Sequence, residues 1–183
     1  MIPQSAQSAS DLKGFASRAW LSGLLDPEKV STTNYFGATK FRDSNPDSKM
    51  AKFVEKKVAK YSAEQKANLS KVIAALSAEA QLDAQRAMDQ RDATIIQEGK
   101  TLLQSEIACT DCHQFHKTDP DATGPDLTGY GSREWLTGMI SDPTHTRFYG
   151  KRNDRMPAFA KEQILDAHAI GLLADWLRGK SDK

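Results

Sequence analysis

The chain has 183 residues, 39% of them hydrophobic, and 25 Lys and Arg residues nearly balance 24 Asp and Glu residues. This hydrophobic fraction supports a folded core and excludes wholesale disorder. The balanced charge argues against nucleic acid as a partner, because such binding depends on clustered basic side chains. No apolar run is long enough to cross a bilayer, so we expect no transmembrane segment. Residues 1–8 also lack the basic and apolar regions of a signal peptide.

A fifteen-residue segment near the N-terminus is repeated later in the chain. Residues 11–25 and 126–140 are identical at eight positions, and most of the others are chemically similar. Each fifteen-residue segment is followed by the same series of short motifs, which are Asp-Pro, an aromatic residue with Gly, Met-x-x-Phe and Glu-Gln. We call this segment, together with the motifs and the helical stretch that follow it, a copy of the repeat. The two Met-x-x-Phe motifs begin at Met50 and Met156. A series of this length does not arise by chance, so the sequence predicts two tandem units of the same kind.

Helical patterns occupy most of the chain outside these motifs. Residues 55–92 are rich in Lys, Glu, Gln and Ala and predict one or two helices with a solvated face. Apolar residues at helical spacing predict a helix over about 95–105 and a short helix over 132–141, with Ser132 as its N-cap. An amphipathic pattern predicts a final helix over about 161–178. The fold class is therefore predicted to be all-α.

Both cysteines of the chain lie in one motif, C-T-D-C-H at residues 109–113. It fits C-x-x-C-H, the attachment pattern of c-type haem, in which the two thiols bind two vinyl groups and the histidine ligates the iron. Two alternatives use the same region. Cys109, Cys112, His113 and His116 are candidate zinc ligands, but they are crowded into eight residues, whereas zinc ligands usually come from two separated segments. A redox-active dithiol normally follows a strand in a βαβ pattern, which this sequence lacks.

From about residue 87 to residue 183 the sequence resembles class I cytochrome c, through the order of its motifs. A helix, C-x-x-C-H, a Gly-Pro loop at 124–125, a short helix, a Met-Pro loop at 156–157 and a terminal helix follow one another. The resemblance implies a complete monohaem domain at 86–183, whose first and last helices cross and pack together. It implies one covalent haem c attached to Cys109 and Cys112, with His113 and Met156 as iron ligands. The Pro125 carbonyl would then accept a hydrogen bond from His113.

The residues themselves also favour Met156 as the sixth ligand of the iron. It lies 43 residues after the proximal His, in a polar loop stiffened by Pro157, and not on an apolar helical stripe. Met139, on the middle helix, is expected to serve in packing, and His145 is the best of the alternative ligands. Donors to the haem propionates are expected among Trp135, Tyr149, Arg152 and Arg155.

The first unit, residues 1–85, carries no attachment motif, because none of the ten residues before Asp11 is a cysteine. We therefore expect a truncated cytochrome c-like unit without haem, in which Met50 serves in packing. Two explanations stay open: the chain has lost a first haem, or the sequence is a piece of a longer two-haem protein. A haem-free unit would leave a costly cavity. Its apolar side chains should therefore fold inward or pack against the haem unit; these are Phe15, Trp20, Leu24, Phe36 and Phe41.

This set of residues predicts an electron carrier and not an enzyme, because His113 and Met156 would occupy both axial positions of the iron. Two other classes of function stay open. A haem enzyme, such as a peroxidase or a small-molecule reductase, would need a free axial position and an acid–base residue, for which His145 is the candidate. A haem-based gas sensor would need Met156 to dissociate.

Two longer motifs, D-L-x-G-F/Y-x-S-R-x-W-L and N-D-R-M-P-A-F, resemble a narrower group of cytochrome c units. These units occur in pairs and are fused to, or encoded with, cytochrome b of bacterial bc-type quinol-oxidising complexes. The resemblance implies a role in a respiratory chain, with cytochrome b, the bc-type complex or a terminal oxidase as redox partner. It also implies a location in the periplasm or on the outer side of the cytoplasmic membrane, with membrane association through a parent polypeptide.

Overall fold

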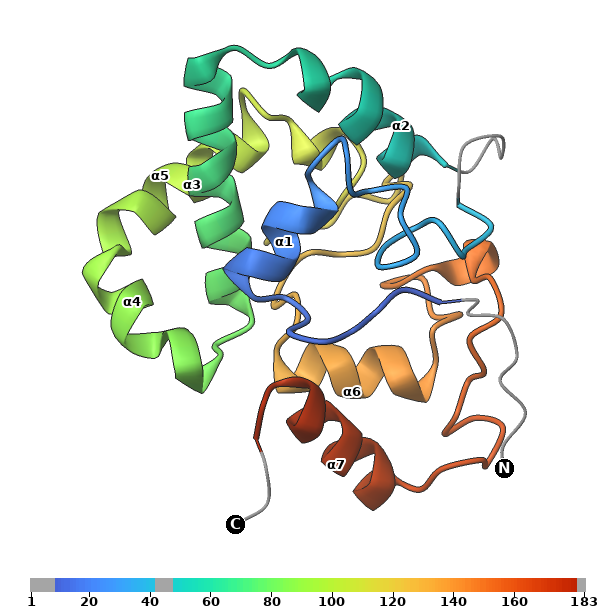
Figure 1. The fold of residues 1–183 in the computed structure, drawn as a ribbon. Helices are drawn as coiled ribbons and strands as arrows, with labels where there is room; N and C mark the ends of the chain where they lie inside the picture. Colours follow the sequence, from blue (N-terminus) through green and yellow to red (C-terminus); the bar gives the residue numbers. More distant parts are fainter. Residues whose placement is uncertain (1–8, 42–47, 181–183) are drawn as a thin grey trace.

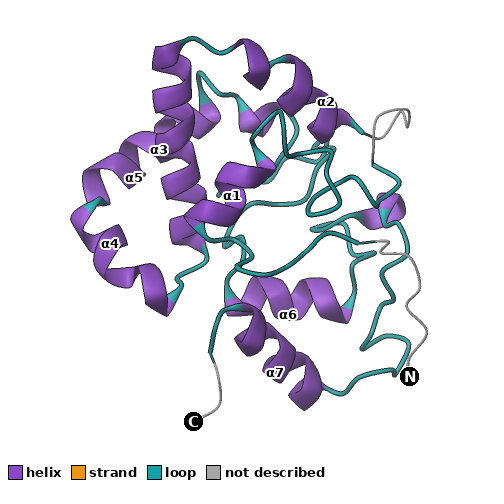
Figure 2. Cartoon of the chain, viewed as in Figure 1, coloured by secondary structure: helices purple, strands orange, loops and turns teal. Residues whose placement is uncertain are grey.

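The structure is a computed structural model that describes residues 9–41 and 48–180. Residues 1–8, which lack the sequence features of a signal peptide, lie outside this part. The described residues form α-helices joined by long loops, with no strand among them (Figures 1 and 2). The predicted all-α fold class is therefore confirmed. Within these residues, no helix is both long enough and apolar enough to cross a bilayer. The helices are α1 (Arg18–Leu24), α2 (Lys49–Lys56), α3 (Ala63–Glu79), α4 (Arg86–Arg91), α5 (Ala93–Gln104), α6 (Arg133–Ser141) and α7 (Ala167–Leu177).

Capping residues explain where the helices begin. Ser132 accepts a hydrogen bond from the Trp135 N–H at 3.1 Å and caps α6, as the sequence predicts. α7 begins at Ala167 and not near residue 161, because Asp166 is its N-cap and accepts a hydrogen bond from the Ala169 N–H at 2.8 Å. α3 and α4 occupy the segment for which one or two helices are predicted, and α5 lies within two residues of its predicted bounds.

Residues 11–25 and 126–140 fold alike and contact each other. In both copies a serine caps the helix, α1 or α6. In both, the indole N–H donates to the carbonyl of the aspartate that opens the repeat, at 3.0 Å from Trp20 and 2.8 Å from Trp135. Phe15 and Tyr130, which occupy equivalent positions, have ring centroids 5.2 Å apart. Contact between equivalent positions is what a two-fold relation between two copies produces. The hydrophobic core accordingly draws on both copies.

The helix that precedes the cysteine motif, α5, packs along α3 of the first copy (Figure 1). Gly99 allows this close crossing, because a Cβ atom there would lie 2.6 Å from the carbonyl carbon of Lys71 and 3.0 Å from the Cβ of Ala75. The helix α7 packs instead against α6. The expectation that the first and last helices of 86–183 pack together is therefore wrong: α5 meets α3 at Gly99 and Ala75, and α7 meets α6.

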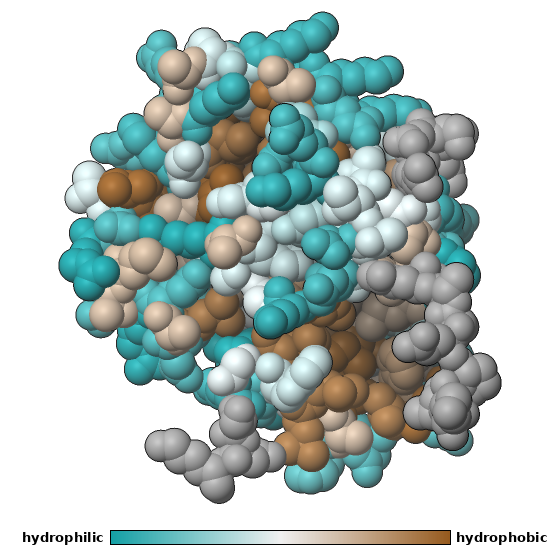
Figure 3. Space-filling view, in the orientation of Figure 1, coloured by the Kyte–Doolittle hydropathy of each residue, from teal (hydrophilic) through white to brown (hydrophobic). Residues whose placement is uncertain are grey.

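One face of α7 is not covered by any helix of the described residues. Leu172 and Leu173 are both 41% exposed, and Trp176 is 69% exposed. Hydrophobic surface gathers in the lower half of Figure 3, where Figure 1 places α6 and α7. In contrast, the equivalent terminal helix of the first copy, α3, has Val72 and Ala75 fully buried beneath its neighbours.

Candidate functional site

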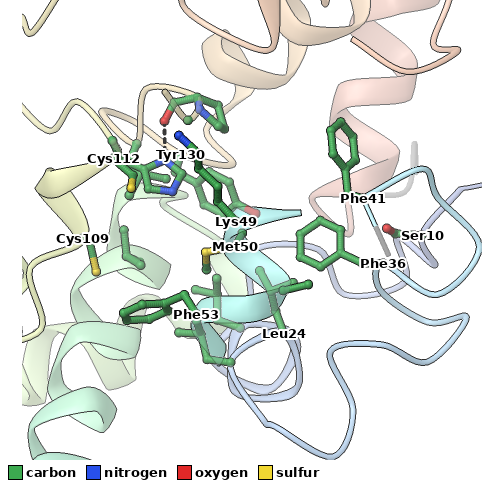
Figure 4. A pocket seen from close by; sticks show the side chains of 18 of the residues that line it. Ser10, Leu24, Phe36, Phe41, Lys49, Met50, Phe53, Cys109, Cys112 and Tyr130 are labelled. Atoms are coloured by element: carbon green, nitrogen blue, oxygen red, sulfur yellow. Dashed lines mark hydrogen bonds between the residues drawn. The ribbon is translucent and has the colours of Figure 1, made fainter. Parts of the chain in front are cut away.

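Cys109 and Cys112 lie on the same side of a tight turn. A 3-10 turn spans Cys109–Asp111, and the Cys112 N–H donates to the Cys109 carbonyl at 3.2 Å. Because a 3-10 helix has three residues per turn, side chains three positions apart point the same way. Both cysteines therefore border one cavity (Figure 4).

The imidazole of His113 is fixed by the loop that follows the motif. Its Nδ1 donates to the Pro125 carbonyl at 2.7 Å, so the hydrogen bond expected from the sequence is present (dashed line in Figure 4). Because a carbonyl only accepts, Nδ1 carries the proton and the Nε2 lone pair is left for another partner. A Cβ atom at Gly124 would lie 2.6 Å from Nδ1 and 3.0 Å from Nε2, so only glycine leaves room for the ring. Burial lowers the pKa of His113, which favours the neutral ring.

A cavity of about 320 Å³ joins the motif to the first copy of the repeat. Its volume lies at the lower end of the range typical of ligand sites. Cys109, Cys112 and His113 line it from the motif (Figure 4). The first copy contributes mainly apolar side chains, among them Phe15, Trp20, Leu24, Phe36 and Phe41. The five side chains therefore face the cavity and do not fill it, and two of them contact the unit at 86–183: Phe15 packs on Tyr130 and Phe41 on Tyr149.

The structure gathers most of the predicted site residues but not all of them. Of the predicted site residues, those that line the cavity are Cys109, Cys112, His113, Pro125, Trp135 and Tyr149. Arg155 and Met156 are not among the lining residues. The guanidinium of Arg155 pairs with Asp154 at 3.0 Å, and Met156 is half-buried against the edge of the core.

Two of the expected propionate donors, Trp135 and Tyr149, make other contacts in the structure. The only N–H of the Trp135 side chain is already used by the Asp126 carbonyl at 2.8 Å, so Trp135 forms an apolar wall of the cavity. Tyr149 stacks on Phe41, with ring centroids 6.1 Å apart. Arg152 lines the cavity and donates to the Thr123 carbonyl.

Sequence reasoning placed one residue of the cavity, Met50, in packing alone. Met50 is the second residue of α2 and lines the same cavity as Cys109, Cys112 and His113 (Figure 4). The internal repeat carried the signal, because it aligns Met50 with Met156. The repeat alone could not place Met50 at the cavity, because it does not show which methionine lies next to the cysteine motif.

The alternatives to haem attachment fit these surroundings poorly. Burial raises the pKa of the Cys109 thiol to about 12, whereas a redox-active cysteine needs a lowered thiol pKa. Across residues 9–41 and 48–180, no group of three His, Cys, Asp or Glu side chains is placed to hold a metal ion directly. His116, the fourth candidate zinc ligand, is turned to Glu79, with its Nε2 3.0 Å from a carboxylate oxygen.

Glu79 is a buried carboxylate that joins the first copy to the region around the motif. Its side chain is 8% exposed and accepts hydrogen bonds from Lys100 Nζ at 3.0 Å, His116 Nε2 at 3.0 Å and the Gly129 N–H at 2.9 Å. Burial raises the pKa of Glu79, but the hydrogen bonds from His116, Gly129 and Lys100 outweigh burial, so its pKa is lowered. The carboxylate therefore stays charged and holds α3, α5 and the loop after the motif together.

No protein-family model, curated protein or solved structure matches this chain. Its function therefore has to be argued from the residues and the geometry described above.

Proposed function

We propose that this chain is an electron-transfer protein that carries one haem c, attached through thioether bonds to Cys109 and Cys112. The proposal rests on one observation: both thiols and the imidazole of His113 border a single, mainly apolar cavity, and Pro125 fixes the imidazole. When bound, the haem supplies a redox centre for single electrons. The residues fit such a group, because Gly124 leaves the imidazole its place and the Nε2 lone pair remains free to ligate iron.

The surrounding residues have distinct roles in this proposal. Pro125 orients the His113 ring and raises its basicity through the hydrogen bond to Nδ1. Trp135 and the first-copy aromatic side chains exclude water, and an apolar environment raises the reduction potential of a haem. Among the predicted propionate donors, Arg152 is the cation that lines the cavity and could meet a carboxylate of the bound group.

The geometry favours electron transfer over a haem enzyme. His145, the acid–base residue that an enzyme would need, is exposed and does not line the cavity. Its Nδ1 instead accepts a hydrogen bond from the Arg147 N–H at 3.2 Å. A gas sensor would require the sixth ligand to leave the iron, so carbon monoxide binding separates that function from simple electron transfer.

For partners and location we rely on the resemblance of the longer motifs to cytochrome c units associated with bc-type complexes. We propose cytochrome b of such a complex, or a terminal oxidase, as the redox partner. We place the protein in the periplasm or on the outer side of the cytoplasmic membrane, with membrane association through a parent polypeptide.

Haem analysis tests this proposal. The full chain, produced in a host that attaches c-type haem, should show one c-type haem per chain in the alkaline pyridine haemochrome. Cys109→Ser and Cys112→Ser should each shift that spectrum toward a haem with one free vinyl group. His116→Ala, a histidine outside the cavity, serves as the control and should leave the spectrum unchanged. Extraction of the haem from the wild-type chain by acid acetone would refute the thioether bonds.

The redox behaviour of the haem protein tests the proposed role in electron transfer. The haem protein should titrate reversibly as a centre for one electron, and the reduced protein should not bind carbon monoxide rapidly. Rapid binding would point to an open or labile axial position, and therefore to the sensor or the enzyme.

A further inference from the structure

We propose that Met50, from the first copy of the repeat, is the sixth ligand of the iron, in place of Met156. This inference rests on the proposed haem attachment and adds to it that the site is shared between the two copies. One copy would supply the thioethers and the proximal His113, and the other copy would supply the distal ligand.

The first support is the position of the methionines. Among the described methionines, Met50 lines the cavity that Cys109, Cys112 and His113 border, and Met88, Met139 and Met156 do not. Figure 4 shows Met50 entering this cavity from α2, while the two cysteines enter it from the motif. Met50 is half-buried and packed against the core, so its thioether lies in apolar surroundings. A thioether is a soft ligand and suits haem iron opposite an imidazole.

The second support is the set of contacts that fix the loop carrying Met156, the alternative sixth ligand. The Asn153 side-chain amide donates to the Met156 carbonyl at 2.8 Å. The next residue along, Asp154, accepts a hydrogen bond from the Lys40 N–H at 3.2 Å, and Lys40 Nζ donates to the Asn153 carbonyl at 3.3 Å. After Met156, the Ala158 N–H donates to the Glu162 carboxylate at 3.0 Å. These contacts fix the loop on both sides of Met156, and Met156 is not among the residues that line the cavity.

The third support is the pairing of the helices. The helix that leads into the cysteine motif, α5, packs along α3, which is the terminal helix of the first copy. In the order of the repeat, Met50 precedes α3 as Met156 precedes α7. The copy whose terminal helix contacts α5 is therefore also the copy whose methionine reaches the motif. Trp20 and Phe53 of that copy line the cavity as well.

The side chain next to Met50 defines the main competitor on α2. Lys49 also lines the cavity, and an amine is the other ligand that this turn of the helix offers. A low-spin iron without a sulfur ligand would point to Lys49. The test must therefore distinguish a sulfur ligand from a nitrogen ligand.

The experiment uses the full-length haem protein and compares Met50→Ala, Met156→Ala and Lys49→Ala. The oxidised wild type should show the weak far-red band of a sulfur–iron bond. Met50→Ala should abolish this band, retain one covalent haem per chain and bind carbon monoxide faster when reduced. Met156→Ala and Lys49→Ala should both keep the band. Loss of the band in Met156→Ala with retention in Met50→Ala would overturn the inference.

Two further measurements cover a variant that does not fold. Met50→His retains a ligand of similar size and should replace the sulfur band with the spectrum of two nitrogen ligands. In the reduced wild type, the ring-shifted methyl signal of the bound methionine should show nuclear Overhauser contacts with Trp20 and Phe53; contacts with Phe159 would identify Met156 and overturn the inference. A wild type with covalent haem but no sulfur band would end this inference and leave the proposed function standing. A wild type without covalent haem would end both.

Discussion

The crossing of α3 and α5 makes Gly99→Ala a sensitive test of the fold that carries the site. The new Cβ atom would lie 2.6 Å from the carbonyl carbon of Lys71, where ordinary contact begins at 3.4 Å. The obstacle is backbone, so the two helices must separate by roughly 1 Å, a gap that removes about a quarter to a half of the dispersion energy at the contact. Overpacking of this kind costs about 1–3 kcal/mol. Alanine returns about 1 kcal/mol through its higher helix propensity. Because the obstacle cannot rotate away, we expect the upper end of this range, about 3 kcal/mol, which leaves a net loss of about 2 kcal/mol.

Gly171→Ala in α7 is the matched control. The nearest atom to its new Cβ is Nη2 of Arg133, at 2.8 Å, which is the end of a flexible and 54% exposed side chain. That side chain can move, so the gain in helix propensity should dominate and stabilise the protein by up to about 1 kcal/mol. Urea unfolding followed by circular dichroism measures both variants as shifts of the midpoint at constant slope. If Gly99→Ala proved as stable as Gly171→Ala, the close crossing of α3 and α5 would be refuted.

Two other predictions concern the contacts between the copies. Glu79→Gln should lower the free energy of unfolding by about 1–2 kcal/mol near neutral pH, because it removes the charge that three donors surround. The lowered pKa of Glu79 means that its contribution is complete above the unfolded value, near 4.5, and is lost as the pH falls through the folded value. The stability difference between wild type and variant should therefore shrink on acidification, and a difference that is constant with pH would contradict the argument. Gly131→Ala and Gly150→Ala both place alanine at a positive φ, +75° and +53°. Only Gly131 faces Ala16 of the other copy, so Gly131→Ala should lower the melting temperature further, and equal losses would show that the copies do not meet there.

Local chemistry made the motif predictable from the sequence. The geometry of Cys109, Cys112 and His113 depends on a turn of a few residues. The hydrogen bond from His113 to Pro125, which the resemblance to class I cytochrome c implied, joins residues only twelve positions apart. The N-cap at Ser132 is equally local, because it depends on a hydrogen bond to a residue three positions on. Such features need little information from the rest of the chain.

The limits of the C-terminal helix show where sequence patterns stop being sufficient. The apolar residues from Ile164 onward suit a helix that begins near residue 161, yet Asp166 caps a helix that begins at Ala167. The amphipathic pattern also predicts a covered face, whereas Leu172 and Trp176 are exposed. The spacing of apolar residues shows that a helix has an apolar face, but it does not show which element packs against that face.

The sequence by itself determined the all-α class, the internal repeat, and the thiols and imidazole of the candidate site, because these follow from periodicity and from contacts between near neighbours. Only the tertiary structure decided that α3, and not α7, packs along the helix that leads into the cysteine motif. The two copies offer chemically equivalent segments, Met50 with α3 and Met156 with α7, and proximity along the chain favours the second pair. Close packing at Gly99 and Ala75 favours the first pair, because a crossing of two helices is decided by the volume at the contact and not by distance along the chain.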